Sequence, residues 1–218
     1  MSLLNFAKMR PTVSISLKSS WSIWGDRNFR IKLIISVILA IILLAFLPFF
    51  FQIIEKRKGL SLNDPILAIL TAQDVSIGVF FIIWSSALFL LTTILYHPKQ
   101  FLTFLTGYII ITCMRLMTIY FLPLEPPPGL IPLKDPLSNS FYGASFITKD
   151  LFFSGHTSTL FLIVLCLQKQ WQRIYSGFGV CVLAVLLLVQ HVHYTIDVIF
   201  AFPFTYISYL LGRRLVAM

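Results

Sequence analysis

Residues 31–51 read IKLIISVILAIILLAFLPFFF, an apolar run that carries one charge, Lys32, near its start. A membrane-spanning helix needs about 20 apolar residues, so this run predicts a transmembrane helix. It is longer than the apolar part of a cleavable signal peptide, and the residues before it are polar and basic. We therefore expect the helix to remain in the membrane, behind a cytoplasmic or interfacial tail formed by residues 1–30.

Five further apolar runs follow this one, and the set predicts an all-α, polytopic membrane protein with six transmembrane helices. The predicted spans are residues 31–51, 75–96, 101–122, 154–170, 174–192 and 195–215. The composition agrees, because 58% of the residues are hydrophobic and 11% are charged, whereas a soluble domain contains about 25% charged residues. We expect residues 31–218 to form one membrane domain.

The distribution of charge predicts the orientation of these helices. The net charge of +9 could indicate nucleic acid, but in a membrane protein cations mark the loops that face the cytoplasm. With a cytoplasmic N-terminus, the inner segments contain one acid, Asp26. They contain eleven cations: Lys8, Arg10, Lys18, Arg27, Arg30, Lys32, Lys99, Lys169, Arg173, Arg213 and Arg214. Both termini are therefore expected in the cytoplasm.

The outer segments, by contrast, are balanced in charge. They are residues 52–74, 123–150 and the short turn 193–195. Their five cations are Lys56, Arg57, Lys58, Lys134 and Lys149, and their six acids are Glu55, Asp64, Asp74, Glu125, Asp135 and Asp150. Because residues 123–150 include six prolines, we expect an irregular segment that covers the outer mouth of the bundle.

Ionisable groups in membrane-spanning segments are costly, so each is a candidate functional residue. The spans and the last outer turn contain Arg115, His156, His191, His193 and Asp197. Arg115 lies about seven residues, or roughly 10 Å, below the outer end of its helix, and the others lie at outer helix ends. Since the orientation rests on loop charges alone, this convergence independently predicts a site on the outer side.

His193 and Asp197 are spaced i, i+4, which places them on one helical face. A carboxylate there can accept the proton of one imidazole nitrogen and leave the other nitrogen free to attack an electrophile. The alternative is a buried His–Asp pair that serves packing alone. His191 is two residues from His193 and projects elsewhere, so we interpret it as structural.

The sequence Ser154-Gly155-His156-Thr157 is typical of a helix start, where free backbone N–H groups can bind an anion. Gly155 would allow close backbone approach, and His156 could donate a proton to a bound phosphate. Arg115 has a guanidinium that matches phosphoryl oxygens. The alternatives are a capped helix at 154–157 and an arginine that snorkels to the interface.

At these residues the sequence resembles a known family. The strings DLFFSGHT at 150–157 and HYTIDV at 193–198 are similar to the two signature motifs of the sphingomyelin synthase family, a branch of the type 2 phosphatidic acid phosphatase superfamily. RLMTIY at 115–120, which leads into the proline-rich loop, resembles part of that family's upstream motif. The resemblance covers roughly residues 105–205, about half of the chain.

The resemblance implies a catalytic membrane domain. In it, His193 attacks phosphorus, Asp197 orients His193, and His156 protonates the departing lipid alcohol. It implies a phospholipid donor, a ceramide or diacylglycerol-like acceptor, an active site on the non-cytoplasmic face, and no metal or other cofactor. The host would be a bacterial inner membrane or a Golgi or plasma membrane. Oligomerisation stays open, and no nucleic acid partner is expected. The expected phosphate and headgroup ligands are Arg115, Lys149, Asp150, Ser154, Gly155, Thr157 and Tyr194.

The chain also departs from the family pattern. Thr148-Lys149 stand where Cys-Gly is usual, and Leu105-Thr106 and Thr112 replace the arginine pair and the tyrosine before Arg115. The residues that set headgroup choice in the family are therefore not the familiar ones.

Three functions remain open from the sequence. The superfamily's phosphatases usually have a KxxxxxxRP motif, which is missing here, and an arginine where this chain has Leu187. A phosphomonoester carries nearly two charges at pH 7 and a phosphodiester one, so a site with Arg115 as its certain cation favours headgroup transfer. The alternatives are a lipid phosphate phosphatase or phospholipase C-like hydrolase, and a non-catalytic lipid-binding or transport protein.

Overall fold

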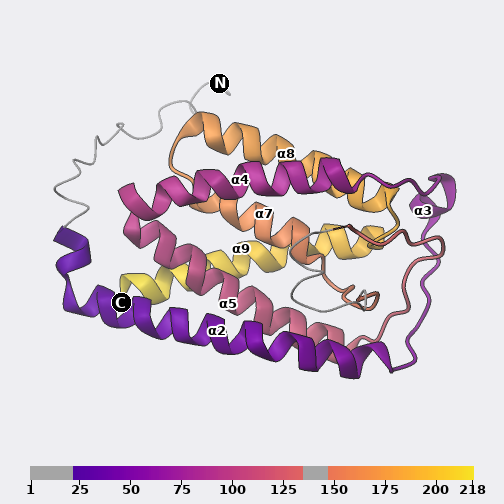
Figure 1. Ribbon diagram of the computed structural model, residues 1–218, viewed down its shortest axis with the longest axis horizontal. Coiled ribbons are helices and arrows are strands. Elements are labelled where there is room, and N and C mark those ends of the chain that lie inside the picture. Colours follow the sequence, from indigo (N-terminus) through magenta and orange to yellow (C-terminus); the bar gives the residue numbers. More distant parts are fainter. Residues whose placement is uncertain (1–21, 135–146) are drawn as a thin grey trace, which may run out of the picture.

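The computed structural model describes residues 22–134 and 147–218, which are helical with irregular connections (Figure 1). The helices are α2 (Arg27–Glu55), α3 (Pro65–Ile69), α4 (Ser76–Tyr96), α5 (Pro98–Phe121), α7 (Gly155–Cys166), α8 (Gln170–Val189) and α9 (Thr195–Ala217). Most of the predicted N-terminal tail and the middle of the proline-rich segment, including Asp135 and Pro136, lie outside the described residues.

Five helices in the described part of the chain are long and apolar enough to cross a membrane: α2, α4, α5, α8 and α9. The predicted span at 154–170 differs, because α7 has only 12 residues. At 1.5 Å per residue it is about 18 Å long, well short of the roughly 30 Å hydrocarbon core. An all-α membrane architecture with five candidate spans is therefore established, and a sixth crossing by α7 stays a prediction.

Helix boundaries follow local capping chemistry. Asp26 begins α2 by accepting a hydrogen bond from the Asn28 backbone N–H at 2.9 Å. α3 has Asp64 as its N-cap and Pro65 in its first turn, a pairing that favours helix initiation. The predicted break at residues 171–173 lies instead at 167–169, where Leu167 has extended backbone angles.

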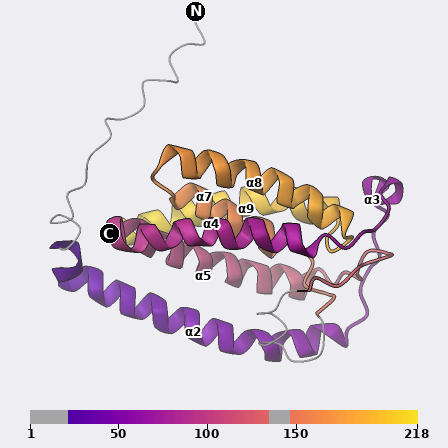
Figure 2. The ribbon, with the colours of Figure 1, turned by 45° about the horizontal axis from the view of Figure 1, so that its top comes forward.

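The short helix α7 lies at the centre of the bundle and packs against α4, α5, α8 and α9. α5 and α9 approach closely, since a Cβ built on Gly212 would lie 3.0 Å from the Gly107 backbone nitrogen. α2 packs chiefly against α5 and stands at the edge of the bundle (Figure 2). Residues 147–154 lead into α7 without helical structure, which is tolerated at membrane depth only where protein buries the backbone.

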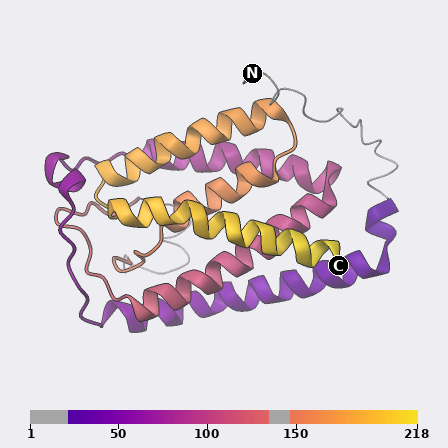
Figure 3. The same cartoon turned by 180° about the vertical axis from the view of Figure 1, so that it is seen from behind.

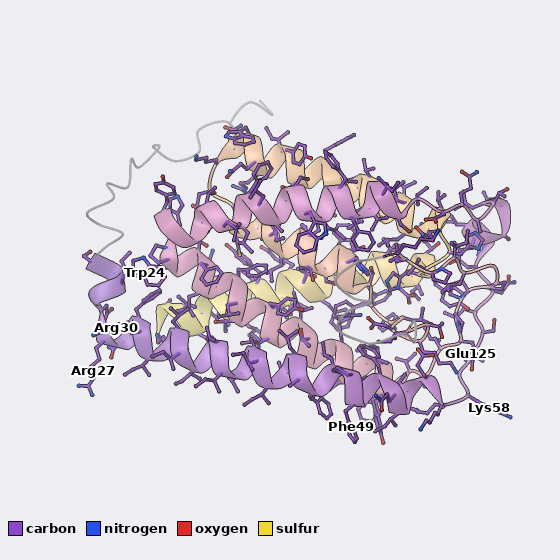
Figure 4. All side chains as sticks on the ribbon, in the orientation of Figure 1. Trp24, Arg27, Arg30, Phe49, Lys58 and Glu125 are labelled. Atoms are coloured by element: carbon purple, nitrogen blue, oxygen red, sulfur yellow. The ribbon has the colours of Figure 1, made fainter. Side chains whose placement is uncertain are left out.

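The start of α2 and the end of α9 lie at one end of the bundle, which we call the inner end (Figure 3). Lys32 Nζ lies 3.3 Å from the carbonyl oxygens of both Leu215 and Val216 there. Trp24 and Arg27 mark this end, and Lys58 and Glu125 mark the opposite, outer end (Figure 4). That both termini face the cytoplasm stays a prediction.

Candidate active site

His193 and Asp197 occupy the turn between α8 and α9 and the first turn of α9. The two side chains are nearly inaccessible, with exposed fractions of 3% and 0%, and His193 Nδ1 lies 3.4 Å from Asp197 Oδ2. Asp197 Oδ2 also accepts a hydrogen bond of 3.0 Å from the Tyr194 backbone N–H. The Asp197 carboxylate therefore caps its own helix and faces the imidazole at the same time.

The contact between these side chains is close but not aligned as a hydrogen bond. His193 Nδ1 and Asp197 Oδ1 are buried and lack hydrogen-bond partners within residues 22–134 and 147–218. A buried polar group without a partner is costly, so both atoms are candidates for interaction with a bound substrate or with each other after a small rotation.

His156, in the first turn of α7, faces His193. Their ring centroids are 6.5 Å apart, with 65° between the ring planes. The two helices are joined directly, because the Ser154 N–H donates to the Asp197 carbonyl at 3.0 Å. His156, His193 and Asp197, which were predicted to converge from separate stretches, therefore form one cluster.

Arg115 on α5 reaches the start of α7 and forms an ion pair with Asp150. Its Nε donates to the Phe153 carbonyl at 2.9 Å. A Cβ added at Gly155 would lie 2.6 Å from Arg115 Cζ. Close approach at Gly155 was predicted, but the group that fills the space is the Arg115 guanidinium.

The remaining groups at the start of α7 are partly engaged by the protein itself. Ser154 Oγ accepts a hydrogen bond of 3.4 Å from the Thr157 N–H. Fewer backbone N–H groups are therefore available to bind an anion than the helix start alone suggested. Thr157 Oγ1 is buried and has no hydrogen-bond partner among the described residues.

Lys149 and Tyr194 contact other parts of the outer end. Lys149 Nζ forms an ion pair of 3.0 Å with Glu125 and donates to the Arg57 carbonyl. The Tyr194 hydroxyl donates to the Glu125 carbonyl at 3.0 Å and accepts from the Leu62 N–H at 3.3 Å. The structure therefore gives both side chains structural partners, and their headgroup binding stays a prediction.

His191 bridges two outer segments. Its Nδ1 lies 2.7 Å from the Pro128 carbonyl and its Nε2 lies 3.2 Å from the Leu70 carbonyl. Its φ of 55° lies in the left-handed region that residues with a Cβ rarely adopt. These contacts agree with the structural interpretation of His191.

The carboxylates that fasten the outer segments to one another were not among the predicted site residues. Glu55 Oε1, at the end of α2, accepts hydrogen bonds of 2.6 and 2.7 Å from the N–H groups of Thr148 and Lys149. These residues precede Asp150, the partner of Arg115. No local sequence signal identifies such a contact, because its two ends are about 93 residues apart.

Hydrogen bonds keep other outer carboxylates ionised. Those from the Gly59 N–H and the Lys149 ammonium lower the pKa of Glu125. Those from Lys134 and Ser76 lower the pKa of Asp74 to about 2. Both groups are therefore charged acceptors throughout the neutral range.

The fold and the site together define a helical membrane protein with a His–His–Asp cluster, of which His193 and Asp197 are buried, beside an arginine. The family model described as "PAP2 superfamily C-terminal" matches residues 149–213, the part of the chain that contains this cluster apart from Arg115. No curated protein matches the chain. The match supports the type 2 phosphatidic acid phosphatase superfamily and is consistent with an enzyme that acts on phosphate esters of lipids.

Proposed function

We propose that this protein is a phospholipid headgroup transferase. It would move a phospho-headgroup from a glycerophospholipid to ceramide or a related lipid alcohol through a phosphohistidine intermediate, as sphingomyelin synthase-like enzymes do. The observation that carries the proposal is that the rings of His156 and His193 face each other. Asp197 lies beside the His193 imidazole, and the Arg115 guanidinium lies against Gly155 at the start of α7.

In the first half-reaction, His193 attacks phosphorus. Nδ1 faces Asp197, so Nε2 is the nitrogen that bonds to phosphorus, and the carboxylate stabilises the imidazolium that forms. The bond between phosphorus and the diacylglycerol oxygen breaks. His156, initially protonated, gives its proton to that oxygen, so diacylglycerol leaves as the alcohol.

In the second half-reaction, the acceptor hydroxyl replaces diacylglycerol. His156, now neutral, removes the proton of the hydroxyl as its oxygen attacks phosphorus. The P–N bond to His193 breaks, and the phosphodiester of the acceptor is released. Both histidines return to their starting protonation states.

The charges at the site favour a phosphodiester substrate over a monoester. Asp150 balances the Arg115 guanidinium, so the pair contributes little net charge. A protonated His156 and the Asp197 carboxylate beside His193 likewise balance, so these four groups carry no net positive charge, which suits the single charge of a phosphodiester better than the nearly two charges of a monoester at pH 7.

An open apolar groove on the surface of the outer half of α2 and α5 supports a substrate with acyl chains. Its volume is about 360 Å³, within the range of small-molecule sites. The lining residues are Phe46, Phe50, Ile53, Ile54, Leu116, Met117, Tyr120 and Phe121. Leu116 follows Arg115 in the chain, so an acyl chain in this groove would lie beside the helix that presents the guanidinium.

The described part of the proline-rich segment lies over the α8–α9 turn. The Ile131 N–H donates to the Gln190 carbonyl at 3.1 Å, and Gln190 Nε2 donates to the Pro132 carbonyl at 3.3 Å. Such a cover would limit the access of water, which would otherwise hydrolyse the intermediate and release the headgroup phosphate.

The proposal is tested by lipid mass spectrometry. Purified protein in nanodiscs of mixed phospholipids is incubated with labelled ceramide, alongside His193→Ala. We expect a labelled phosphodiester from the wild type and a decrease of at least about a thousandfold in the variant. Diacylglycerol and phosphorylated headgroup without labelled product would establish a hydrolase instead. Turnover that survives in His193→Ala would contradict the mechanism, and ligand binding without turnover would indicate a binding protein.

A further inference from the structure

The α8–α9 turn that carries His193 is held from outside the helices that it connects. We call residues 56–75, which link α2 to α4, the first outer loop. The Gln73 N–H donates to the Val189 carbonyl at 3.1 Å, and the Leu62 N–H donates to the Tyr194 hydroxyl at 3.3 Å. The first outer loop thus contacts the turn on both sides of His193.

The Asp64 side chain contacts both α3 and the start of α9. Its Oδ1 accepts hydrogen bonds from the N–H groups of Ile66 at 3.0 Å and Leu67 at 3.3 Å, which begin α3. Its Oδ2 accepts a hydrogen bond of 2.6 Å from the Thr195 N–H, and Oδ1 lies 3.0 Å from the Thr195 hydroxyl. One carboxylate therefore caps two helices that lie 131 residues apart in the chain.

Thr195 is the first residue of α9 and lies two residues after His193 and two before Asp197. Fixing its N–H and hydroxyl fixes the point where the chain turns from the imidazole toward the carboxylate. In-line attack needs the reacting nitrogen about 3 to 3.5 Å from phosphorus and correctly oriented. A shift of Thr195 would therefore change the presentation of His193 without removing a group that touches substrate.

We propose that Asp64 is the positioning residue for His193, and that the first outer loop is part of the catalytic apparatus although it lies outside residues 149–213. The inference rests on the proposed function for its kinetic consequence. Its structural content, that Asp64 holds the α8–α9 turn, does not depend on the reaction.

The variant Asp64→Asn distinguishes the contacts of Asp64 with the start of α3 from its contacts with the start of α9. Asparagine is as good an N-cap as aspartate, so its carbonyl oxygen can still accept from Ile66 and Leu67. Its NH2 group is a donor and cannot accept from the Thr195 N–H. The variant therefore preserves the start of α3 and loses the hydrogen bond to the Thr195 N–H, while the contact between Oδ1 and the Thr195 hydroxyl can remain.

The matched control is Asp26→Asn, which makes the same change at the N-cap of α2 at the inner end. For both variants, kcat and KM are measured per folded enzyme, together with hydrogen exchange of residues 189–198. For Asp64→Asn we expect kcat to fall about tenfold to a hundredfold, KM to change less than about twofold, and exchange in 189–198 to accelerate. Asp26→Asn should change none of these.

A double-mutant cycle with Thr195→Val tests whether Asp64 acts through Thr195. If it does, Asp64→Ala, which removes both contacts with Thr195, should lose no further activity when Thr195→Val is added. Losses that multiply would overturn the inference, as would a kcat of Asp64→Asn equal to that of Asp26→Asn. Unchanged exchange in 189–198 would overturn it even if the protein had no transferase activity, whereas an inactive wild type with accelerated exchange in the variant would reject only the proposed function.

Discussion

The two ends of the bundle use charge in different ways. At the outer end, Glu55, Asp64, Asp74, Glu125 and Asp150 each accept a hydrogen bond or ion pair from another segment or helix. At the inner end, the one acid, Asp26, caps its own helix, and the surroundings are rich in cations. The outer end is therefore built from specific pairs, and the inner end from charge of one sign.

The difference shows where the fold needs accurate positions. Cations at the inner end need only to lie near lipid phosphates, which a flexible lysine or arginine achieves without fixed partners. Under the proposed mechanism, the outer end must hold His156, His193 and Asp197 within a fraction of an ångström of a reactive arrangement. The same acids and bases that led to the predicted orientation also supply the contacts that hold these loops to one another.

The largest effect that would test this comparison comes from Gly155→Ala. The added Cβ would collide with the Arg115 guanidinium, so Arg115 must leave its position beside Asp150 and the Phe153 carbonyl. We expect headgroup transfer to fall at least about a hundredfold, measured as initial rate per folded protein. Gly177→Ala is the control, because its nearest contact is 4.0 Å away at Val164. Equal rates in the two variants would show that the Arg115 position is unimportant.

A change of pH sharpens the comparison by acting on the outer pairs. Burial raises the pKa of Asp64, but the hydrogen bonds from Thr195, Leu67 and Ile66 together outweigh it and lower the pKa from its ordinary 3.8. The pKa values of Asp74 and Glu125 are also lowered. A lowered pKa in the folded state means that the contribution is complete above about pH 4 to 5 and is lost as the pH falls through the lowered pKa.

We therefore expect hydrogen exchange of residues 56–75, corrected for the intrinsic rate, to be the same at pH 7 and pH 5. It should accelerate only as the pH falls below about 4. Release of the first outer loop between pH 7 and pH 5 would contradict the assignment of its contacts to carboxylates.

The smallest expected effect is at the inner end. Lys32→Met removes the ammonium that faces the carbonyls at the end of α9, a contact worth about 0.3–1 kcal/mol. Activity should stay within about twofold of the wild type, because α9 is fixed at the outer end by its own contacts. A tenfold loss in the same assay would show that the inner end also positions the site.

The sequence predicted the helices, which are marked by long apolar runs. It did not predict the features that depend on contacts between residues far apart in the chain. Among the helices of the described residues, the apolar runs located α2, α4, α5, α7, α8 and α9 within a few residues. The loop charges predicted that His156, His193 and Asp197 would meet. The length of α7 was overestimated because residues 167–170 are compatible with a helix locally, whereas the backbone is extended at Leu167.

The features of the site that the sequence did not predict have a common cause. Asp64 followed by Pro65 is a recognisable helix start, so α3 was predictable in principle. Nothing local to Asp64 indicates that its second oxygen binds Thr195, and nothing local to Gly155 indicates that a side chain from α5 fills its missing Cβ. Both are consequences of how the helices assemble.

The bridge from Asp64 to Thr195 also has a consequence for biogenesis. A ribosome completes the first outer loop long before it completes the α8–α9 hairpin, since the two partners are separated by 131 positions. The Asp64 carboxylate in this loop therefore cannot bind Thr195 until the last hairpin enters the membrane. Chains that stop before α9 lack Asp197, so the contact between His193 and Asp197 cannot form until α9 has been made.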